Sequence, residues 1–354
     1  MSSAACKAQA VSDERAPPKS TPSPHDTLFR FTFERTEHAV AELRAVLPEA
    51  LAMRVDWSTL RVIAGTLVDE DFAKRESDLL YEVQLAGRET LLYVLFEHQS
   101  SVDKWMPLRL LGYVVRALER YSRDHKRLPL PAIVSVVLHH SPTGWTAARS
   151  LHEMFELPGD ALAALGPYLP NLSFVLEDLA RVDVEALRVR ADLPLFVRLV
   201  LLALKRAREA ADIVEEFAAW GDEIDALAEQ APRGMEDLVV VLRYTSMVAQ
   251  IDFDRLQGIF RGRAAEEAVM TTAKQLIEQG RVEGEARGEA RGEARGEARG
   301  RAATLLKLLR THRSNLGPLS AEDVERIEGA SIAALDLWIE RLFTAASLDE
   351  LFGP

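Results

Sequence analysis

The spacing of apolar residues changes several times along this chain, and each change predicts a different element. Residues 25–47 have apolar side chains at helical spacing, with Asp26 as the expected N-cap and Pro48 limiting the C-terminal end. Residues 103–123 return to helical spacing. Four short apolar runs predict strands, at residues 60–68, 79–85, 91–96 and 131–138. The predicted order is helix, three strands, helix, strand.

The pattern becomes almost entirely helical after about residue 145. Proline residues break residues 157–170 into a linker or a short helix. Amphipathic helices are then predicted at residues 194–209, 211–229, 235–251 and 264–280. The fold class expected from the pattern is therefore α+β, with an αβββαβ core followed by a mostly helical C-terminal half.

Residues 284–299 are four exact copies of Gly-Glu-Ala-Arg. The period of four favours Glu–Arg pairs on a helix, whereas each glycine costs about 1 kcal/mol relative to alanine, so we expect a solvated helix or a flexible spacer. The predicted domains are a disordered tail, a core domain, a helical region, this spacer and a small helical unit. Their boundaries are 1–24, 25–155, 156–280, 281–301 and 302–354.

Composition narrows the class of protein. The 354 residues carry a formal net charge of −12, so a nucleic-acid partner would need a local basic patch. The one cysteine, Cys6, excludes a disulfide framework within the chain and favours a reducing, cytoplasmic setting. No secretory signal is recognised at the start, and the apolar runs are too short to span a bilayer, so no membrane partner is expected.

The two central strands carry the candidate chemistry. Residues 77–85 and 91–100 predict a β-hairpin, which would bring Asp78 at the start of one strand beside Glu97 at the end of the other. Gln99 alternates with His98 and therefore shares a face with Glu97. Two carboxylates at one end of a sheet form an oxygen-rich site suited to Mg²⁺ or Mn²⁺. Such a site is typical of metal-dependent phosphodiester hydrolysis.

At these residues the chain resembles a known family. The order of elements, with Asp78 followed by Glu97-x-Gln99, is similar to the PD-(D/E)xK nuclease superfamily, whose core is restriction-endonuclease-like. Further blocks resemble the Rpn family of recombination-promoting nucleases, which are also labelled transposases. Those blocks are HDTLF (25–29), SDLLY (77–81), EHQSS (97–101), MPLRLLGY (106–113) and the strand at 128–138. Residues 25–155 carry most of the resemblance, and the unit from residue 302 resembles a helical domain often appended to the family.

The resemblance implies a role for each candidate residue. Asp78 and Glu97 would hold Mg²⁺ (or Mn²⁺), and Gln99 occupies the position usually filled by lysine. Because the lysine role can move to a neighbouring helix in such proteins, Lys104 is the replacement candidate, with Lys74 as another. Asp26 would add an outer-shell carboxylate. The family implies Mg²⁺-dependent, largely sequence-nonspecific DNA endonuclease activity linked to recombination.

Several readings stay open from the residues alone. Arg109 and Tyr113, four apart on one predicted helix, either contact DNA phosphate or pack beside the sheet. His98 is expected to pack or to form a hydrogen bond rather than bind metal. His139 and His140 are not expected to form a metal pair, because adjacent strand residues face opposite ways. Because Gln99 lacks the usual charge, the alternative function is a catalytically weak or inactive DNA-binding or assembly module. A third reading is a helical scaffold in which the C-terminal half dominates, and the Gly-Glu-Ala-Arg spacer either spaces domains or joins subunits into a homo-oligomer.

Overall fold

The computed structural model describes most of the chain, which divides into two compact units. The described residues are 23–63, 79–85, 91–208, 210–230, 232–251, 253–256, 258–312 and 316–353. The units are Met1–Thr272 and Ala273–Pro354. Residues 1–22 of the predicted tail lie outside the described residues, whereas its last residue, Pro24, belongs to α1. Residues 64–78 and 86–90, which flank β2, also lie outside them. Within the described part of the chain, no helix has the length and apolarity needed to cross a membrane.

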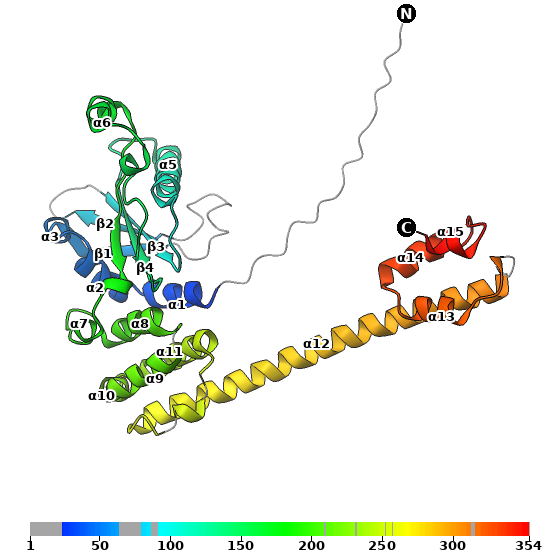
Figure 1. Cartoon of the computed structure of the whole chain (residues 1–354). Helices are drawn as coiled ribbons and strands as arrows, with labels where there is room; N and C mark the ends of the chain where they lie inside the picture. The colour runs from blue at the N-terminus through cyan, green and yellow to red at the C-terminus, as the bar shows by residue number, and fades with distance from the viewer. Residues whose placement is uncertain are drawn as a thin grey trace, which may run out of the picture. The chain divides into compact units, whose positions relative to one another are not determined.

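A five-stranded mixed sheet forms the centre of the first unit (Figure 1). Its strands follow one another in sequence order, β1-β2-β3-β4-β5. The first three strands are antiparallel, whereas β4 and β5 run parallel to β3. The strands are β1 (Val55–Val62), β2 (Leu79–Leu85), β3 (Leu91–Gln99), β4 (Ala132–His139) and β5 (Val175–Asp178).

Helices make up most of the remaining described residues. The first unit contains α1 (Pro24–Phe33), α2 (Thr36–Val46), α3 (Glu49–Ala52), α5 (Met106–His125), α6 (Gly159–Leu165), α7 (Val184–Arg188), α8 (Leu195–Arg206), α9 (Ala210–Ala219), α10 (Gly221–Ala228) and α11 (Gly234–Ala249). Short 3₁₀ turns occur at His152–Met154, Gly166–Tyr168, Leu179–Arg181 and Phe253–Arg255. The remaining helices are α12 (Arg263–His312), α13 (Ala321–Glu328), α14 (Ile332–Arg341) and α15 (Leu348–Phe352).

Strand alternation gives the sheet two apolar faces, and a different set of helices buries each one. Phe96 of β3 and Leu138 of β4 pack in the larger core, where α1, α2 and α8 cover the sheet. Val137 directly precedes Leu138 in β4 and therefore faces the other way. It packs in the second core, beneath α5, with Met106 and Leu110. A strand buried on both faces needs apolar residues at nearly every position, which explains the continuous apolar run of β3.

The sequence prediction of an α+β fold with an αβββαβ core is confirmed, with local corrections. The first helix divides at Glu34, and its N-cap is Ser23 rather than Asp26. The Ser23 hydroxyl oxygen accepts a hydrogen bond from the Asp26 amide at 3.2 Å, while the hydroxyl also donates to the Asp26 carboxylate at 2.7 Å. β1 begins earlier than predicted, at Val55, and residues 64–68 of the predicted strand lie outside the described residues. β5 was missed. The predicted helix at 211–229 is two helices that meet at Trp220.

One large core joins the sheet to the helices that follow it. Buried side chains from Leu28 through Val269 belong to that core, so the predicted boundary near residue 155 falls inside the first unit. Helix α8 is apolar on most sides and almost fully buried, as expected for a helix surrounded by neighbours. Arg35 donates two hydrogen bonds to the Asp237 carboxylate, at 2.8 and 2.6 Å, and so links the start of α2 to α11.

The second unit has its own core, formed by the end of α12 with α13, α14 and α15. Ser320 and Asp323 form a reciprocal capping box at the start of α13. The Gly-Glu-Ala-Arg copies lie within α12, so the helical reading of the repeat is the one that the structure has. Ion pairs along this helix, such as Arg281–Glu285 at 2.5 Å and Arg301–Glu297 at 2.7 Å, have the expected spacing of four.

A fully buried carboxyl group lies between α2 and β5. Glu42 has no exposed surface, and the nearest guanidinium nitrogen of Arg190 is 4.0 Å from its carboxylate. Arg190 also pairs with Glu177 of β5 at 3.3 Å. Burial and the negative charge of Glu177 raise the pKa of Glu42 to about 8, although Arg190 opposes the shift. Glu42 is therefore protonated in the folded protein at neutral pH.

Replacing Glu42 by glutamine should stabilise the protein at alkaline pH. Because the pKa of Glu42 is higher in the folded state, its contribution to the free energy of unfolding is present below pH 4.5 and is lost as the pH rises towards 8. We expect the free energy of unfolding of Glu42→Gln to exceed that of the wild type by roughly 4 kcal/mol at pH 8 and by little at pH 4.5. Denaturant melts across this range measure it, with exposed Glu49→Gln as control; parallel curves for both variants would contradict it.

Candidate functional site

Polar residues occupy the carboxyl ends of the three parallel strands. Gln99 of β3 pairs with His139 of β4, which in turn pairs with Asp178 of β5. Two residues earlier, the backbone of Glu97 pairs with that of Val137. The carboxyl edge of parallel strands is the usual place for ligand sites in α/β sheets. The predicted Glu-x-Gln pair therefore lies at a chemically suitable edge of this sheet.

The two predicted metal ligands are described to different degrees. β2 and β3 pair antiparallel in the predicted hairpin, and their first described pair at this edge is Leu79 with Phe96. Asp78 lies outside the described residues, as does Lys74. For Glu97 the structure describes the backbone in β3 but not the side chain. Among the side chains that are described, no three His, Cys, Asp or Glu converge on a common metal position.

The segment between β3 and α5 brings further predicted residues to this edge. Asp103 accepts a hydrogen bond from the amide of Trp105 at 2.8 Å and forms an ion pair with Arg109 at 2.7 Å. Lys104 is exposed, and its ammonium nitrogen lies 5.7 Å from the centre of the Trp105 ring. Arg109 is therefore held against the start of α5, whereas Lys104 extends from the surface.

Tyr113 packs in the core instead of lying at the surface. Its side chain is 5% exposed and belongs to the cluster under α5. The guanidinium carbon of Arg116 lies 5.2 Å from the centre of the Tyr113 ring. Arg109 and Tyr113 were the two expected DNA-contact residues. Arg109 is partly exposed to solvent, whereas the ring of Tyr113 is buried.

Asp26 lies on the α1 side of the sheet. Its carboxylate is 3.3 Å from Nδ1 of His98, whose ring packs against Phe29 of α1. Burial raises the pKa of Asp26, but hydrogen bonds from His98 and Ser23 outweigh it and leave that pKa below its usual value. His98 alternates along β3 with Glu97 and Gln99. The contact that the structure gives Asp26 is therefore with a neighbouring histidine.

Three histidines gather on this side of the sheet, as the packed histidine reading expects. The His98 and His140 rings stack with centres 4.8 Å apart, and His25 lies 4.8 Å from His140. Nδ1 of His140 donates to the carbonyl oxygen of Leu204 at 3.0 Å, and Nδ1 of His25 lies 2.8 Å from the Tyr244 hydroxyl. Burial, followed by the charge of His98, lowers the pKa of His140 to about 2 and that of His25 to about 4.

His139 packs on the opposite side from His140. Its ring meets that of Trp145 edge-on at 5.1 Å, and Asp178 accepts a hydrogen bond from the Trp145 amide at 2.9 Å. Burial lowers the pKa of His139, and the negative charge of Asp178 partly opposes this. Asp178 also receives the amide of Ala180 at 3.3 Å, so its carboxylate anchors the chain around the strand end.

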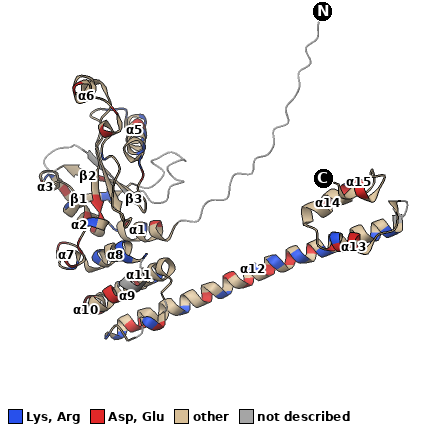
Figure 2. Ribbon diagram, in the orientation of Figure 1, with Lys and Arg blue, Asp and Glu red and all other residues tan. Residues whose placement is uncertain are grey.

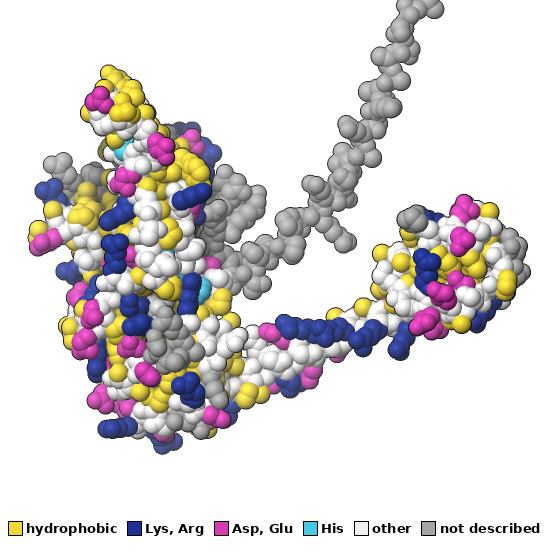
Figure 3. All heavy atoms as spheres, viewed as in Figure 1, with side chains coloured by type: hydrophobic (Ala, Val, Ile, Leu, Met, Phe, Trp, Pro, Cys, Tyr) yellow, Lys and Arg dark blue, Asp and Glu magenta, His cyan; other side chains and the backbone are white. Residues whose placement is uncertain are grey.

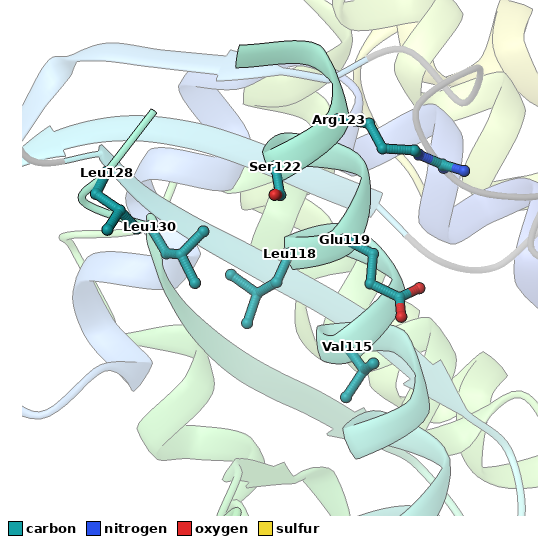
Figure 4. A pocket seen from close by; sticks show the side chains of 7 residues that line it. All are labelled: Val115, Leu118, Glu119, Ser122, Arg123, Leu128 and Leu130. Atoms are coloured by element: carbon teal, nitrogen blue, oxygen red, sulfur yellow. The ribbon is translucent and has the colours of Figure 1, made fainter. Parts of the chain in front are cut away.

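An apolar pocket lies elsewhere, beside the C-terminal half of α5 (Figure 4). Val115 and Leu118 line it from the helix, and Leu128 and Leu130 line it from the segment before β4. Its volume of about 600 Å³ is within the range of small-molecule sites, but it lacks converging carboxylates. None of its lining residues belongs to the carboxyl edge of the parallel strands.

Sequence reasoning missed two parts of this region. Asp178 escaped notice because β5 has only four residues and follows a proline-rich stretch. The arginines at positions 116, 120 and 123 also went unremarked, although their spacing from Arg109 was readable as one stripe of a helix.

Comparisons with known proteins agree with the predicted resemblance. The model of the family described as "Putative transposase, YhgA-like" matches residues 23–234. "Recombination-promoting nuclease RpnC" from Escherichia coli (strain K12) is 27% identical over 266 residues, or 73% of this chain and 82% of that protein. No solved structure matches the chain.

Two further matches cover a smaller share of this chain. "Recombination-promoting nuclease RpnD" from Escherichia coli O157:H7 is 31% identical over 129 residues, which are 36% of this chain and 50% of that protein. The "inactive recombination-promoting nuclease-like protein RpnE" from Escherichia coli (strain K12) is 32% identical over 124 residues, 35% of this chain and 41% of that protein. The chain is therefore similar both to proteins named as nucleases and to a protein named as inactive.

Removing the buried imidazole of His140 should make the protein less sensitive to acid. The unfolded chain binds a proton at His140 near pH 6.5, whereas the folded protein does not until about pH 2, so stability is lost as the pH falls below 6.5. We expect His140→Asn to reduce the slope of unfolding free energy against pH between 6 and 4 by about 1 kcal/mol per pH unit. The exposed His125→Asn is the control in denaturant melts; an unchanged slope for His140→Asn would refute the assignment.

Proposed function

The chain belongs to the "Putative transposase, YhgA-like" family, and from that membership we propose that it is a Mg²⁺-dependent DNA endonuclease. Support comes from relatives named recombination-promoting nucleases, one of which aligns with 73% of this chain. A role in DNA recombination or in mobile elements is part of the proposal, on the same basis. The cytoplasmic setting stays a prediction from the single cysteine.

The observation that carries the proposal is the register of β2 and β3. Leu79 pairs with Phe96, and the next residues in sequence are Asp78 and Glu97. Antiparallel pairing continued by one step would place these two carboxylates on adjacent strands, close enough to share one cation. The oxygen donors are the kind that Mg²⁺ and Mn²⁺ prefer. This donor set fits Mg²⁺ or Mn²⁺ better than Zn²⁺, which favours nitrogen and sulfur ligands.

Each residue of the edge then has a proposed task. Asp78 and Glu97 would hold the cation, which when bound supplies a Lewis acid that stabilises negative charge on a phosphate oxygen. Gln99 carries an amide that can orient the attacking water but cannot neutralise charge. Lys104, exposed a few residues beyond β3, has the positive charge that Gln99 lacks. Asp26 would act as an outer-shell carboxylate, and the contact that its carboxylate makes is with His98.

The second candidate function is a DNA-binding or assembly module that no longer cleaves. The glutamine at position 99 favours it, as does the relative whose name describes it as inactive. The two functions differ in one respect that can be measured. Both bind DNA, but only the nuclease needs Asp78 and Glu97 for turnover.

Removing either predicted ligand should abolish cleavage. We expect Asp78→Asn and Glu97→Gln to nick supercoiled plasmid at least about 100-fold more slowly than the wild type in Mg²⁺, because neutral amides hold the cation poorly. Gel assays over a Mg²⁺ series measure the rates, and circular dichroism checks the fold. Glu49→Gln, an exposed acid on α3, is the control and should cleave normally. Equal cleavage by all four proteins would eliminate these ligands, and no cleavage by the wild type would favour the binding module.

A lysine outside position 99 should supply the missing charge. We expect Lys104→Ala to slow plasmid nicking at least about tenfold with the Mg²⁺ dependence unchanged, because the cation ligands remain. Lys104→Arg should restore part of the rate. Lys274→Ala, which removes an exposed lysine of α12, is the control. If Lys74→Ala alone slows the reaction, the role belongs to Lys74 instead.

A further inference from the structure

We propose that four arginines of α5, Arg109, Arg116, Arg120 and Arg123, form a track for the phosphate backbone of the DNA duplex that this protein cleaves. We call these four residues the arginine stripe. The inference rests on the proposed nuclease function, because DNA is the partner that function requires. It assigns binding of the duplex to one face of α5. The candidate cation site alone does not say which surface of the protein binds the duplex.

The spacing of these arginines places them on one side of the helix. At 3.6 residues per turn, positions 109, 116, 120 and 123 fall within about 60° of the circumference of α5. The buried residues Met106, Leu110 and Tyr113 occupy a neighbouring side, which faces the sheet. The stripe therefore runs along a flank of the helix, where the aliphatic stems can pack and the guanidinium groups can reach solvent.

Neighbouring groups hold three of the four guanidinium groups in place. Arg109 pairs with Asp103 at 2.7 Å, and Arg120 pairs with Asp124 at 3.3 Å. Arg116 packs over the ring of Tyr113. The side chains of Arg109 and Arg120 are 19% and 28% exposed, whereas Arg123 is exposed at the C-terminal end. Because these side chains are already ordered, less conformational entropy is lost when they bind phosphate.

Charge sets this helix apart from the average of the chain. Residues 103–127 contain seven Lys and Arg against three Asp and Glu, in a protein with a net charge of −12. Figure 2 marks the Lys and Arg of α5, and Figure 3, seen from the same side, shows both signs of charge interspersed over this face. A local basic patch of this kind is what an acidic protein needs in order to bind a polyanion.

Length and position both suit a DNA backbone. Fourteen residues separate the ends of the stripe, or about 21 Å along the helix, which matches about six phosphate steps of one strand. Helix α5 begins at Met106, which belongs to the same buried cluster as Val137, the residue whose backbone pairs with Glu97. A backbone lying on the stripe would therefore lead towards the carboxyl edge where cleavage is proposed. Arginine also presents several donors to phosphate in a planar fork.

Binding without cleavage tests the stripe separately from catalysis. The probe is a fluorescein-labelled 30-base-pair DNA duplex, titrated with the full chain in EDTA and read by fluorescence anisotropy from 50 to 200 mM NaCl. We expect the double variant Arg120→Gln, Arg123→Gln to bind at least about tenfold more weakly than the wild type at 100 mM NaCl. The slope of log affinity against log salt should fall by roughly 2, since two phosphate contacts are lost.

The matched control removes the same charge elsewhere. Arg44 and Arg54 are exposed on and after the helices of the opposite side of the sheet, and Arg44→Gln, Arg54→Gln should bind nearly as the wild type does. Equal loss in both double variants, or no loss in the stripe variant, would overturn the proposal, and so would tighter binding of an RNA duplex of the same length. Stripe-dependent binding without Mg²⁺-dependent cleavage would refute only the nuclease, whereas cleavage with stripe-independent binding would refute only the stripe.

Discussion

The pairing of β3 with its two neighbours is the constraint on which the rest of this structure depends. β3 runs antiparallel to β2 and parallel to β4, so both sides of its backbone are hydrogen-bonded. Residues alternate between a core under α1, α2 and α8 and a core under α5. A shift of one residue would move Phe96 and His98 to the other face and disrupt both cores. The register is therefore fixed by burial, and it fixes where the Glu-x-Gln pair lies.

The mixed direction of the sheet explains why its polar residues collect at one edge. β3, β4 and β5 are parallel, so Gln99, His139 and Asp178 form a row across their carboxyl ends. β2 begins at the same edge because it is antiparallel to β3. The histidine groups on either side of the row are buried, and the lowered pKa values of His140 and His139 keep them neutral. The neutral histidine rings pack against the ends of the strands, and the candidate functional groups at the carboxyl edge are then carboxylates and the Gln99 amide.

Much of the core could be predicted from the sequence because its signals are local. Apolar runs identified β2, β3 and β4, and helical spacing identified α5. β5 was missed since its four residues are too few to show a period, and its place depends on pairing with β4, which is distant in sequence. Asp26 was taken for an N-cap because the pattern did not reveal the hydroxyl of Ser23 as the better acceptor.

The sequence predicted the strand pairing at the candidate site but not the contacts of its side chains. Antiparallel pairing of β2 with β3 followed from hairpin spacing, and the structure has it. The contacts of Asp26 with His98 and of Tyr113 with the core depend on how helices dock on the sheet, which spacing along one helix does not specify. The acidic composition concealed the basic flank of α5, because net charge averages over the chain.

The most direct test of the central claim is to locate the cation. Crystals of the full chain grown with Mn²⁺ would show it by anomalous scattering at its absorption edge. The account predicts a single strong peak at the carboxyl edge of β3, within roughly 2.0–2.6 Å of carboxylate oxygens of both Asp78 and Glu97. A peak held by other residues, or full-occupancy Mn²⁺ at that edge in the Asp78→Asn, Glu97→Gln double variant, would contradict it.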